Sequence, residues 1–328
     1  MFFATAEGFR ALRRSWGLVL FLLALNVAAA GLLAVPLAGA LEANLDKTGA
    51  ASRMMYGFDY GWWSRWSEEQ SGWTSSFSPR LFGVGFAFEN VDRLLRGELP
   101  GRLYVRGAEE GEDHQGLDPV LLGLGAAYLF LQTFLAGGLL GVLRQGQGSW
   151  TLRGLLHGSG FYCGRFLRIA LLALAADALV FGLNAPFARF VDHRALEAVS
   201  ETTAMALAFG RHAVLLLALL FVHMVSSYAK VIVVLEERSS AVLALLSSVS
   251  FCLARLGRAA GHYLAVVAIG VGALAAWSAA DGAWAATGYK TQVVALVLMQ
   301  GFVAARIALR LALMAGQVAL WNSRSEFH

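Results

Sequence analysis

Six stretches of the chain consist almost entirely of apolar residues and are separated by polar segments. They cover residues 16–37, 119–143, 166–186, 212–235, 261–280 and 291–313. Each holds about 20 residues, the number that crosses a hydrocarbon core of about 30 Å as an α-helix. The pattern predicts an all-α polytopic membrane protein in which residues 1–328 form a single domain of six transmembrane helices.

Arginines at the ends of these stretches predict the orientation. They precede the first stretch and fill the connection between the second and third: Arg10, Arg13, Arg14, Arg144, Arg153, Arg165 and Arg168. Because short basic loops stay on the cytoplasmic side, we expect a cytoplasmic N-terminus, and six spans return the C-terminus to the same side. The long segment 41–118 is then a periplasmic loop. The first stretch exceeds the apolar core of a cleaved signal peptide, so we expect a retained anchor.

Composition supports a membrane protein of bacterial origin. Hydrophobic residues make up 58% of the chain and charged residues 15%, with a mean hydropathy of +0.60, outside the range of soluble domains. The excess of Ala, Gly, Leu and Arg is typical of a GC-rich bacterial genome, which favours the bacterial inner membrane. The net charge of +4 follows the predicted topology, so it indicates a lipid bilayer rather than nucleic acid as the partner.

Motifs for known catalytic chemistry are missing from the sequence. Cys163 and Cys252 lack the spacing of zinc ligands, and no nucleotide-binding, dinucleotide-binding, zinc-protease or haem-attachment signature occurs. We therefore expect no metal, no cofactor and no catalytic residue. A membrane enzyme is kept as a third class of function, although nothing pairs a nucleophile with a base.

The segment 41–118 is rich in aromatic residues and predicts a contact surface. Four tryptophans lie close together in it: Trp62, Trp63, Trp66 and Trp73. Such a density is typical of the bilayer interface or of a surface that binds other membrane-protein subunits. Residues 78–96 predict an amphipathic helix that begins with Ser78 as cap and Pro79 as first residue. The segment is too small to be an independent domain without disulfides.

Residues 149–168 and 239–258 align without gaps and share a Phe-x-x-x-Arg-x-x-Arg pattern. This predicts an internal repeat of residues 120–187 and 212–280, in which a surface helix and a turn join two spans. Ser149 and Ser239 are the expected helix caps. Arginines of the pattern are expected to bind lipid headgroups: Arg13, Arg165, Arg168, Arg255 and Arg258. Alternatively, arginines simply recur at every cytoplasmic boundary.

Polar residues near the middle of the spans are the strongest candidates for a functional site. They are Asp177, His223, Asn26, Gln132 and Gln300. Ionisable side chains at the bilayer centre must face protein or water. Asp177 and His223 have matching depth on consecutive spans and predict a proton-titratable pair. The alternative is that these residues only form hydrogen bonds between helices.

Glycines four residues apart, Gly137 with Gly141 and Gly160 with Gly164, match the spacing of closely packed membrane helices. The segments FRALRR, GFDYGWW, FLAGGLLGVLR and FYCGRFLR together resemble those of uncharacterised six-span bacterial inner-membrane proteins, a resemblance that implies the fold but no activity. We therefore expect a non-catalytic scaffold or accessory subunit of a larger membrane assembly. The alternative is a proton-coupled transporter or lipid-handling permease that uses Asp177 and His223.

Overall fold

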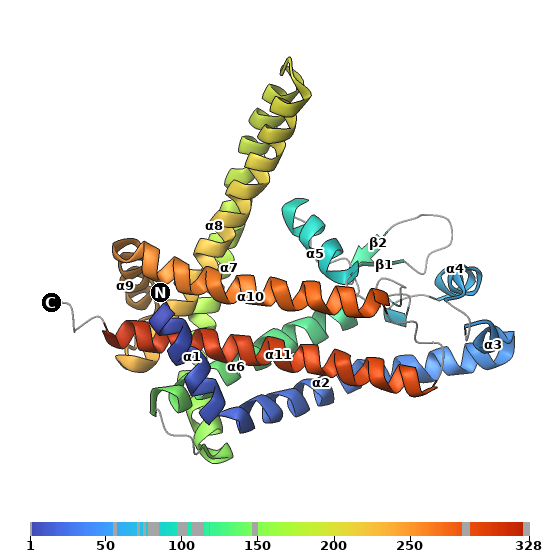
Figure 1. The fold of residues 1–328 in the computed structure, drawn as a ribbon, viewed down its shortest axis with the longest axis horizontal. Coiled ribbons are helices and arrows are strands. Elements are labelled where there is room, and N and C mark those ends of the chain that lie inside the picture. Colours follow the sequence, from blue (N-terminus) through green and yellow to red (C-terminus); the bar gives the residue numbers. More distant parts are fainter. Residues whose placement is uncertain are drawn as a thin grey trace. The chain divides into compact units, whose positions relative to one another are not determined.

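The computed structural model describes residues 2–54, 58–70, 73–74, 77, 85–96, 104–106, 115–117, 119–145, 150–283 and 289–323. The elements in chain order are α1 (Phe2–Arg14), α2 (Trp16–Thr48), α3 (Ala50–Met54), α4 (Tyr60–Glu69), α5 (Gly85–Arg96), β1 (Tyr104–Arg106), β2 (Gln115–Leu117), α6 (Pro119–Gln145), α7 (Leu152–Leu196), α8 (Glu201–Leu235), α9 (Ala241–Ala254), α10 (Leu256–Ala283) and α11 (Tyr289–Asn322) (Figure 1). The two short strands pair antiparallel. The fold is thus almost entirely helical, as predicted.

Six of these helices are long and apolar enough to cross a membrane: α2, α6, α7, α8, α10 and α11. They coincide with the six predicted stretches, which confirms the predicted transmembrane helices by length and composition. Most are longer than predicted. The helix α2, for example, continues through Pro36 to Thr48, so residues 41–48 belong to this helix and not to the loop in which the sequence placed them.

The chain divides into two compact units, and the single domain expected from the sequence stays a prediction. Unit 1 contains Met1–Ser15, Phe130–Val267 and Arg310–His328, and unit 2 contains Trp16–Leu129 and Ala268–Leu309. The described residues of the predicted loop 41–118 belong to unit 2, and the expected lack of independence of this loop stays a prediction. The candidate site described below lies wholly within unit 1.

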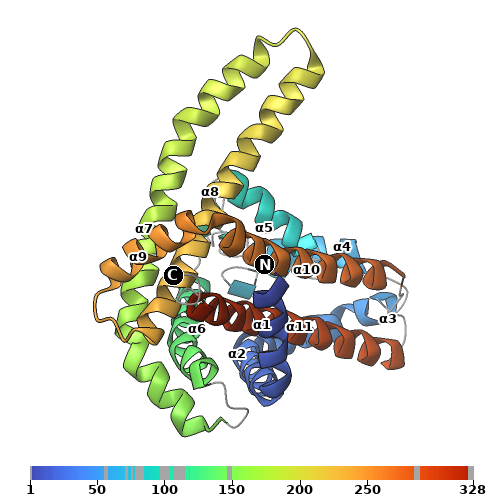
Figure 2. The ribbon, with the colours of Figure 1, turned by 60° about the vertical axis from the view of Figure 1, so that its left-hand side comes forward.

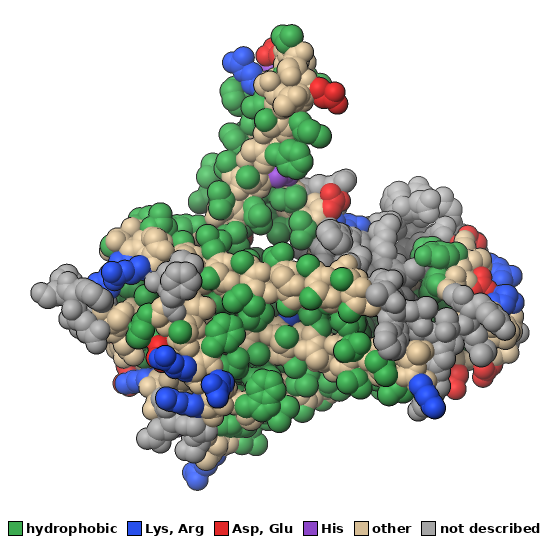
Figure 3. Space-filling view, in the orientation of Figure 1, with side chains coloured by type: hydrophobic (Ala, Val, Ile, Leu, Met, Phe, Trp, Pro, Cys, Tyr) green, Lys and Arg blue, Asp and Glu red, His purple; other side chains and the backbone are tan. Residues whose placement is uncertain are grey.

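The helices α7 and α8 form a long antiparallel hairpin in unit 1 (Figure 2). With 45 residues, α7 is about 67 Å long at 1.5 Å rise per residue, more than twice the thickness of a hydrocarbon core. Residues 187–211, predicted to connect two spans, are therefore mostly helical. An ion pair of 2.6 Å between Arg211 and Asp192 joins the two helices there. Hydrophobic side chains cover most of the hairpin, and charged side chains gather at its tip (Figure 3).

The two halves of the predicted repeat fold differently. In the second half, Ser240 caps the start of α9, and Arg255, with φ −128° and ψ 38°, separates the end of α9 from the start of α10. In the first half, α7 starts after its cap Thr151 and runs through Arg165 without a break. The predicted turn is therefore present at Arg255 and wrong at Arg165. The expected cap Ser149 lies outside the described residues, and Ser239 lies one residue before the observed cap.

Small residues allow α6 and α7 to approach closely. A Cβ atom on Gly138 would lie 2.1 Å from the carbonyl oxygen of Leu155, and one on Gly137 would lie 2.9 Å from Cβ of Tyr162. At Gly141, Gly160 and Gly164 a Cβ atom would meet nothing within 4 Å. The sequence motif thus identified Gly137 as a packing residue, and was wrong for the other three glycines.

The N-terminal helix α1 packs against α10 and α11 in the same unit. A Cβ atom on Gly8 would lie 2.3 Å from the carbonyl oxygen of Ala312, so the two backbones are in direct contact. The fully buried His262 of α10 forms hydrogen bonds to Thr5 Oγ1 at 3.0 Å and to the Leu313 carbonyl at 3.2 Å. The start of the chain is therefore fixed to the end of α11.

Candidate interior polar site

Seven polar residues of unit 1 lie on facing sides of membrane helices, and we call them the interior polar site. They are Gln132 of α6, His223, Ser227 and Lys230 of α8, Tyr263 of α10, and Arg310 and Gln317 of α11. Their spacing explains how the site forms. Residues 223, 227 and 230 follow one face of α8, and residues 310 and 317 follow one face of α11, because helical positions four and seven apart share a face.

The first layer of the site contains Gln132, His223, Tyr263 and Arg310. The Tyr263 hydroxyl and His223 Nδ1 form a hydrogen bond of 2.6 Å, and Arg310 Nη1 donates to Gln132 Oε1. Gln132, His223 and Arg310 all lie about 18 to 20 Å from the C-terminal ends of their helices at 1.5 Å rise per residue. That depth is near the middle of a hydrocarbon core. Tyr263 lies about 10 Å from the start of α10 and joins these three residues through its hydrogen bond to His223, so we call the group the central layer.

The second layer, nearer the helix ends, contains Ser227, Lys230 and Gln317. Ser227 Oγ donates to Gln317 Oε1 at 2.8 Å, which joins α8 to α11. Gln317 is fully buried, and its Nε2 has no hydrogen-bond partner among the described residues. Lys230 is half-buried, and within the described part of the chain its ammonium group forms neither a hydrogen bond nor an ion pair. We call this group the inner layer.

The electrostatics of the site are dominated by positive charge. Arg310 lies near enough to both His223 and Lys230 for like-charge repulsion, and Lys230 has the same effect on His223. A charged side chain at this depth in a membrane costs a few kcal/mol or more unless it faces water or a partner. His223 and Arg310 are nonetheless exposed at the surface of the chain. The site therefore presents cations at membrane depth on an open face.

The structure links His223 to Tyr263 and not to Asp177. Asp177 lies half-buried on α7, and its side chain has no hydrogen bond or ion pair with any residue that the structure describes. Of the other predicted residues, Gln132 belongs to the site as the partner of Arg310. Asn26 accepts a hydrogen bond of 3.2 Å from the Tyr128 hydroxyl in unit 2, and Gln300 is half-buried in unit 2. Asn26 thus joins two helices in the way expected of a packing amide.

The sequence contained a signal for the residues that were missed. Lys230 and Arg310 lie inside the predicted spans 212–235 and 291–313, where a charge by itself indicates a functional site. Gln317 follows Arg310 at the same helical face, just beyond the predicted end of the last span. Equal depth alone does not identify these three residues, because they are related by the helix face that they share.

The tryptophans predicted to contact partners lie in a local core of unit 2. Trp62 and Trp66 are each only 2% exposed and stack on each other, packed with Ala50. Trp62 Nε1 donates to Asn44 Oδ1 at 2.8 Å. Trp62 and Trp66 are therefore not available as a contact surface, which corrects the prediction; Trp63 and Trp73 are half-buried. We call this group of residues around Trp62 and Trp66 the aromatic core.

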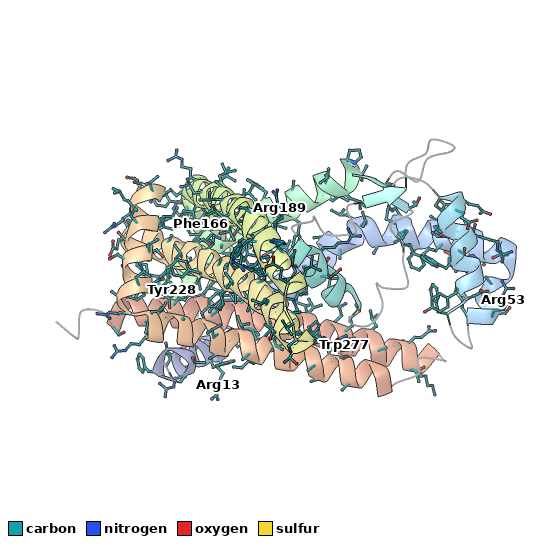
Figure 4. All side chains as sticks on the ribbon, turned by 90° about the horizontal axis from the view of Figure 1, so that it is seen from above. Arg13, Arg53, Phe166, Arg189, Tyr228 and Trp277 are labelled. Carbon is teal, nitrogen blue, oxygen red and sulfur yellow. The ribbon has the colours of Figure 1, made fainter. Side chains whose placement is uncertain are left out.

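The aromatic core is held at the start of α4 by charged side chains. Asp59 Oδ1 caps α4 by accepting from the Trp62 amide at 3.0 Å, and Asp59 Oδ2 accepts from Arg53 Nε at 2.6 Å. Figure 4 labels Arg53, which lies in the last turn of α3. The hydrogen bond from Arg53, followed by that from the Trp62 amide, holds the pKa of the Asp59 carboxyl below its usual value. The predicted amphipathic helix is present as α5, and its expected start at Ser78 and Pro79 lies outside the described residues.

The arginines predicted to bind headgroups lie at the surface of unit 1. Arg13, Arg168 and Arg258 are exposed, whereas Arg165 and Arg255 are half-buried. Arg165 stacks on Phe161 at 4.8 Å and donates to the Glu237 carbonyl, and Arg255 stacks on Phe251 at 5.9 Å. Headgroup binding stays a prediction for all five, and two of them also have packing roles.

The described residues offer no evident metal site or thiolate. Within them, no three His, Cys, Asp or Glu side chains gather as metal ligands would. Burial raises the pKa of the Cys252 thiol to about 11, so this thiol is protonated at neutral pH and is a poor nucleophile. Comparison of the chain with protein-family models, curated proteins and solved structures finds no match. Function must therefore be argued from the site itself.

Proposed function

We propose that this protein is a membrane permease in which a polar solute or a lipid headgroup passes the interior polar site. The observation that carries the proposal is the exposure of Arg310 and His223 near the middle of their membrane helices. If that face met hydrocarbon, the charge alone would cost about 3 kcal/mol or more. A water-filled crevice on this face removes the penalty and gives a solute access to the site.

The proposal replaces the predicted pair of Asp177 and His223 with a different set of residues. His223 is bonded to Tyr263 and stands beside two cations, an arrangement suited to holding a polar or anionic group rather than a metal ion. A permease needs such polar groups at mid-depth, where they replace the water that the solute loses. The location in a bacterial inner membrane, with cytoplasmic termini and a periplasmic segment 41–118, belongs to the same proposal.

Thiol accessibility tests the proposed crevice. In a background of Cys163→Ser and Cys252→Ala, His223→Cys is compared with Leu167→Cys, which lies on an exposed apolar face of α7 (41% exposed) at a similar distance from its helix end. Intact membrane vesicles are treated with a charged thiosulfonate reagent. The crevice predicts that position 223 reacts at least tenfold faster than position 167. Equally slow reaction at both positions contradicts it.

A scaffold or accessory subunit is the second candidate, and the tip of the α7–α8 hairpin favours it. Apolar side chains there are widely exposed, with Leu196 at 87% and Phe209 at 68%. The aromatic core is unsuited to partner binding because its central residues are buried, so the tip takes over the role predicted for the tryptophans. A partner that co-purifies in fixed ratio and is lost with Leu196→Ser and Phe209→Ser supports the scaffold; isolation of a lone chain contradicts it.

A further inference from the structure

Two hydrogen-bond donors of the inner layer have no acceptor in the described part of the chain. One is Nε2 of Gln317, a side chain that is fully buried. The other is the ammonium group of Lys230, which is half-buried in a membrane helix. A buried amide donor without an acceptor lowers stability, and a charged group inside a membrane helix lowers it further. The buried amide nitrogen of Gln317 and the partly exposed ammonium of Lys230, both without an acceptor in the described part of the chain, together favour an acceptor from outside it.

The two donors belong to the same helix contact. Ser227 binds the amide oxygen of Gln317, so this oxygen is occupied and the amide nitrogen is the group left over. Lys230 follows Ser227 by one turn on the same face of α8, which is the face that meets Gln317. Lys230 and Gln317 each lie five residues before the C-terminal end of their helix, so both belong to the same level of the contact between α8 and α11.

The positive charge near Lys230 indicates the charge of the ligand. Arg310 adds a second positive charge near Lys230, so a cation is repelled and an acceptor with negative charge is favoured. Ammonium and amide N–H groups both donate to oxygen, and hydrogen bonds to an ionised acceptor are about twice as strong as neutral ones. A water molecule would satisfy the amide but leave the charge of Lys230 uncompensated.

We propose that Lys230 and Gln317 bind an oxyanion, a carboxylate or phosphate group, between α8 and α11. This inference rests on the proposed permease function for its route of access and names the class of substrate. Ser227 positions Gln317 by holding the amide oxygen, so the amide nitrogen stays directed to the ligand. A free solute and the phosphate of a lipid headgroup share this chemistry.

Binding to the purified protein tests the inference directly. The full chain in neutral detergent is titrated with sodium acetate, with sodium phosphate and with mixed micelles containing phosphatidic acid, and the unfolding temperature is followed. We expect one of these anions to raise it for the wild-type protein and for Lys290→Met, a matched control on an exposed lysine. Lys230→Met and Gln317→Leu should each weaken the apparent affinity at least tenfold.

The outcomes separate the ligand sources and the two proposals. Stabilisation by acetate or phosphate identifies a free solute, and stabilisation by phosphatidic acid alone identifies a headgroup. The inference is overturned if an anion raises the unfolding temperature of Lys230→Met as much as that of the wild-type protein, or if no anion raises that of a folded wild-type protein. Water would then be the partner of the two donors. A reactive thiol in His223→Cys without anion binding by the wild-type protein retains the permease and rejects the oxyanion. Anion binding by the wild-type protein together with an unreactive thiol in His223→Cys supports the oxyanion site and contradicts the permease.

Discussion

The interior polar site of unit 1 and the aromatic core of unit 2 both bring polar side chains into an apolar surrounding, but they satisfy them differently. In the aromatic core, Asn44 accepts from the buried Trp62. At the exposed edge of this core, Asp59 accepts from Arg53 and from the start of α4. In the interior polar site, Lys230 and Gln317 keep donors without an acceptor in the described chain. The aromatic core leaves only the neutral Trp66 indole without a partner among these residues.

This difference in hydrogen-bond partners distinguishes polar side chains that stabilise the fold from polar side chains that are available to bind a ligand. A polar group that has found its partner within the fold contributes about 0.5–1.5 kcal/mol to stability. A charged side chain without a partner in the fold lowers the stability of the protein, and binding of an external partner offsets this loss of free energy. The sequence predicted a contact surface at the tryptophans and a possible site at His223 and Gln132, but it did not assign Lys230, because burial and hydrogen-bond partners cannot be read from residue type alone.

The largest expected effect is on the aromatic core. Trp62→Ala removes a buried indole and its hydrogen bond to Asn44, so it should destabilise the core by about 3–5 kcal/mol. Hydrogen exchange of the α4 amides measures this loss. The half-buried Trp63, replaced by alanine, is the control and should have a smaller effect. Equal effects of the two substitutions would contradict the burial that distinguishes them.

Replacing Lys230 should have the opposite sign. Lys230→Met removes an unpartnered charge from a membrane helix and keeps a side chain of similar length, so the ligand-free protein should gain about 1–3 kcal/mol. Unfolding in mixed detergent micelles measures the gain. Lys290→Met, on an exposed lysine, should change little. A loss of stability at Lys230 would mean that the lysine has a structural partner and that the comparison drawn above fails.

The two stacked tryptophans allow the hydrogen bond itself to be isolated. Trp62→Phe and Trp66→Phe remove similar area from side chains that are each 2% exposed. Only Trp62→Phe leaves an acceptor, Asn44 Oδ1, without its donor, so it should cost about 1–3 kcal/mol more than Trp66→Phe. Hydrogen exchange of α4 compares them. Equal costs would show that burial alone, and not satisfied polarity, stabilises this core.

The smallest effect concerns the charge on Asp59. Because its pKa is lowered in the folded protein, its contribution is complete above the unfolded value of about 3.9 and is lost as the pH falls through the folded value. Asp59→Asn keeps the helix cap but should abolish this acid-side loss of protection in α4. Asp46→Asn, at an exposed carboxylate, is the control. An unchanged pH profile in Asp59→Asn would contradict the assignment.

The membrane helices could be predicted from the sequence because hydropathy and length alone determine them. The helix ends were less accessible: α7 continues through Arg165 where the related segment breaks at Arg255, and nothing in the shared Phe-x-x-x-Arg pattern separates the two cases. The two arginines also differ in their contacts, since Arg165 donates a hydrogen bond to the carbonyl of Glu237, just beyond the end of α8. Gly137 and Gly138 likewise become packing residues only where α7 meets them.

Only part of the candidate site could be predicted, because the sequence gives the depth of a residue but not the residues that it contacts. Depth can be counted along each span, and this found His223 and Gln132. Partners depend on which faces of the helices meet, so Tyr263 and Arg310 could not be assigned to them by counting. The burial of Trp62 and Trp66 depends on Ala50 and on the extension of α2 to Thr48, both hidden in a segment that the sequence described as a loop.

An experimental density map of the full chain in lipid nanodiscs would test most directly whether the inner layer is completed by something other than the protein. The account predicts ordered non-protein density within hydrogen-bond distance of both Lys230 Nζ and Gln317 Nε2. A carboxylate or carbonyl of the chain itself at that place, paired with both donors, would contradict it.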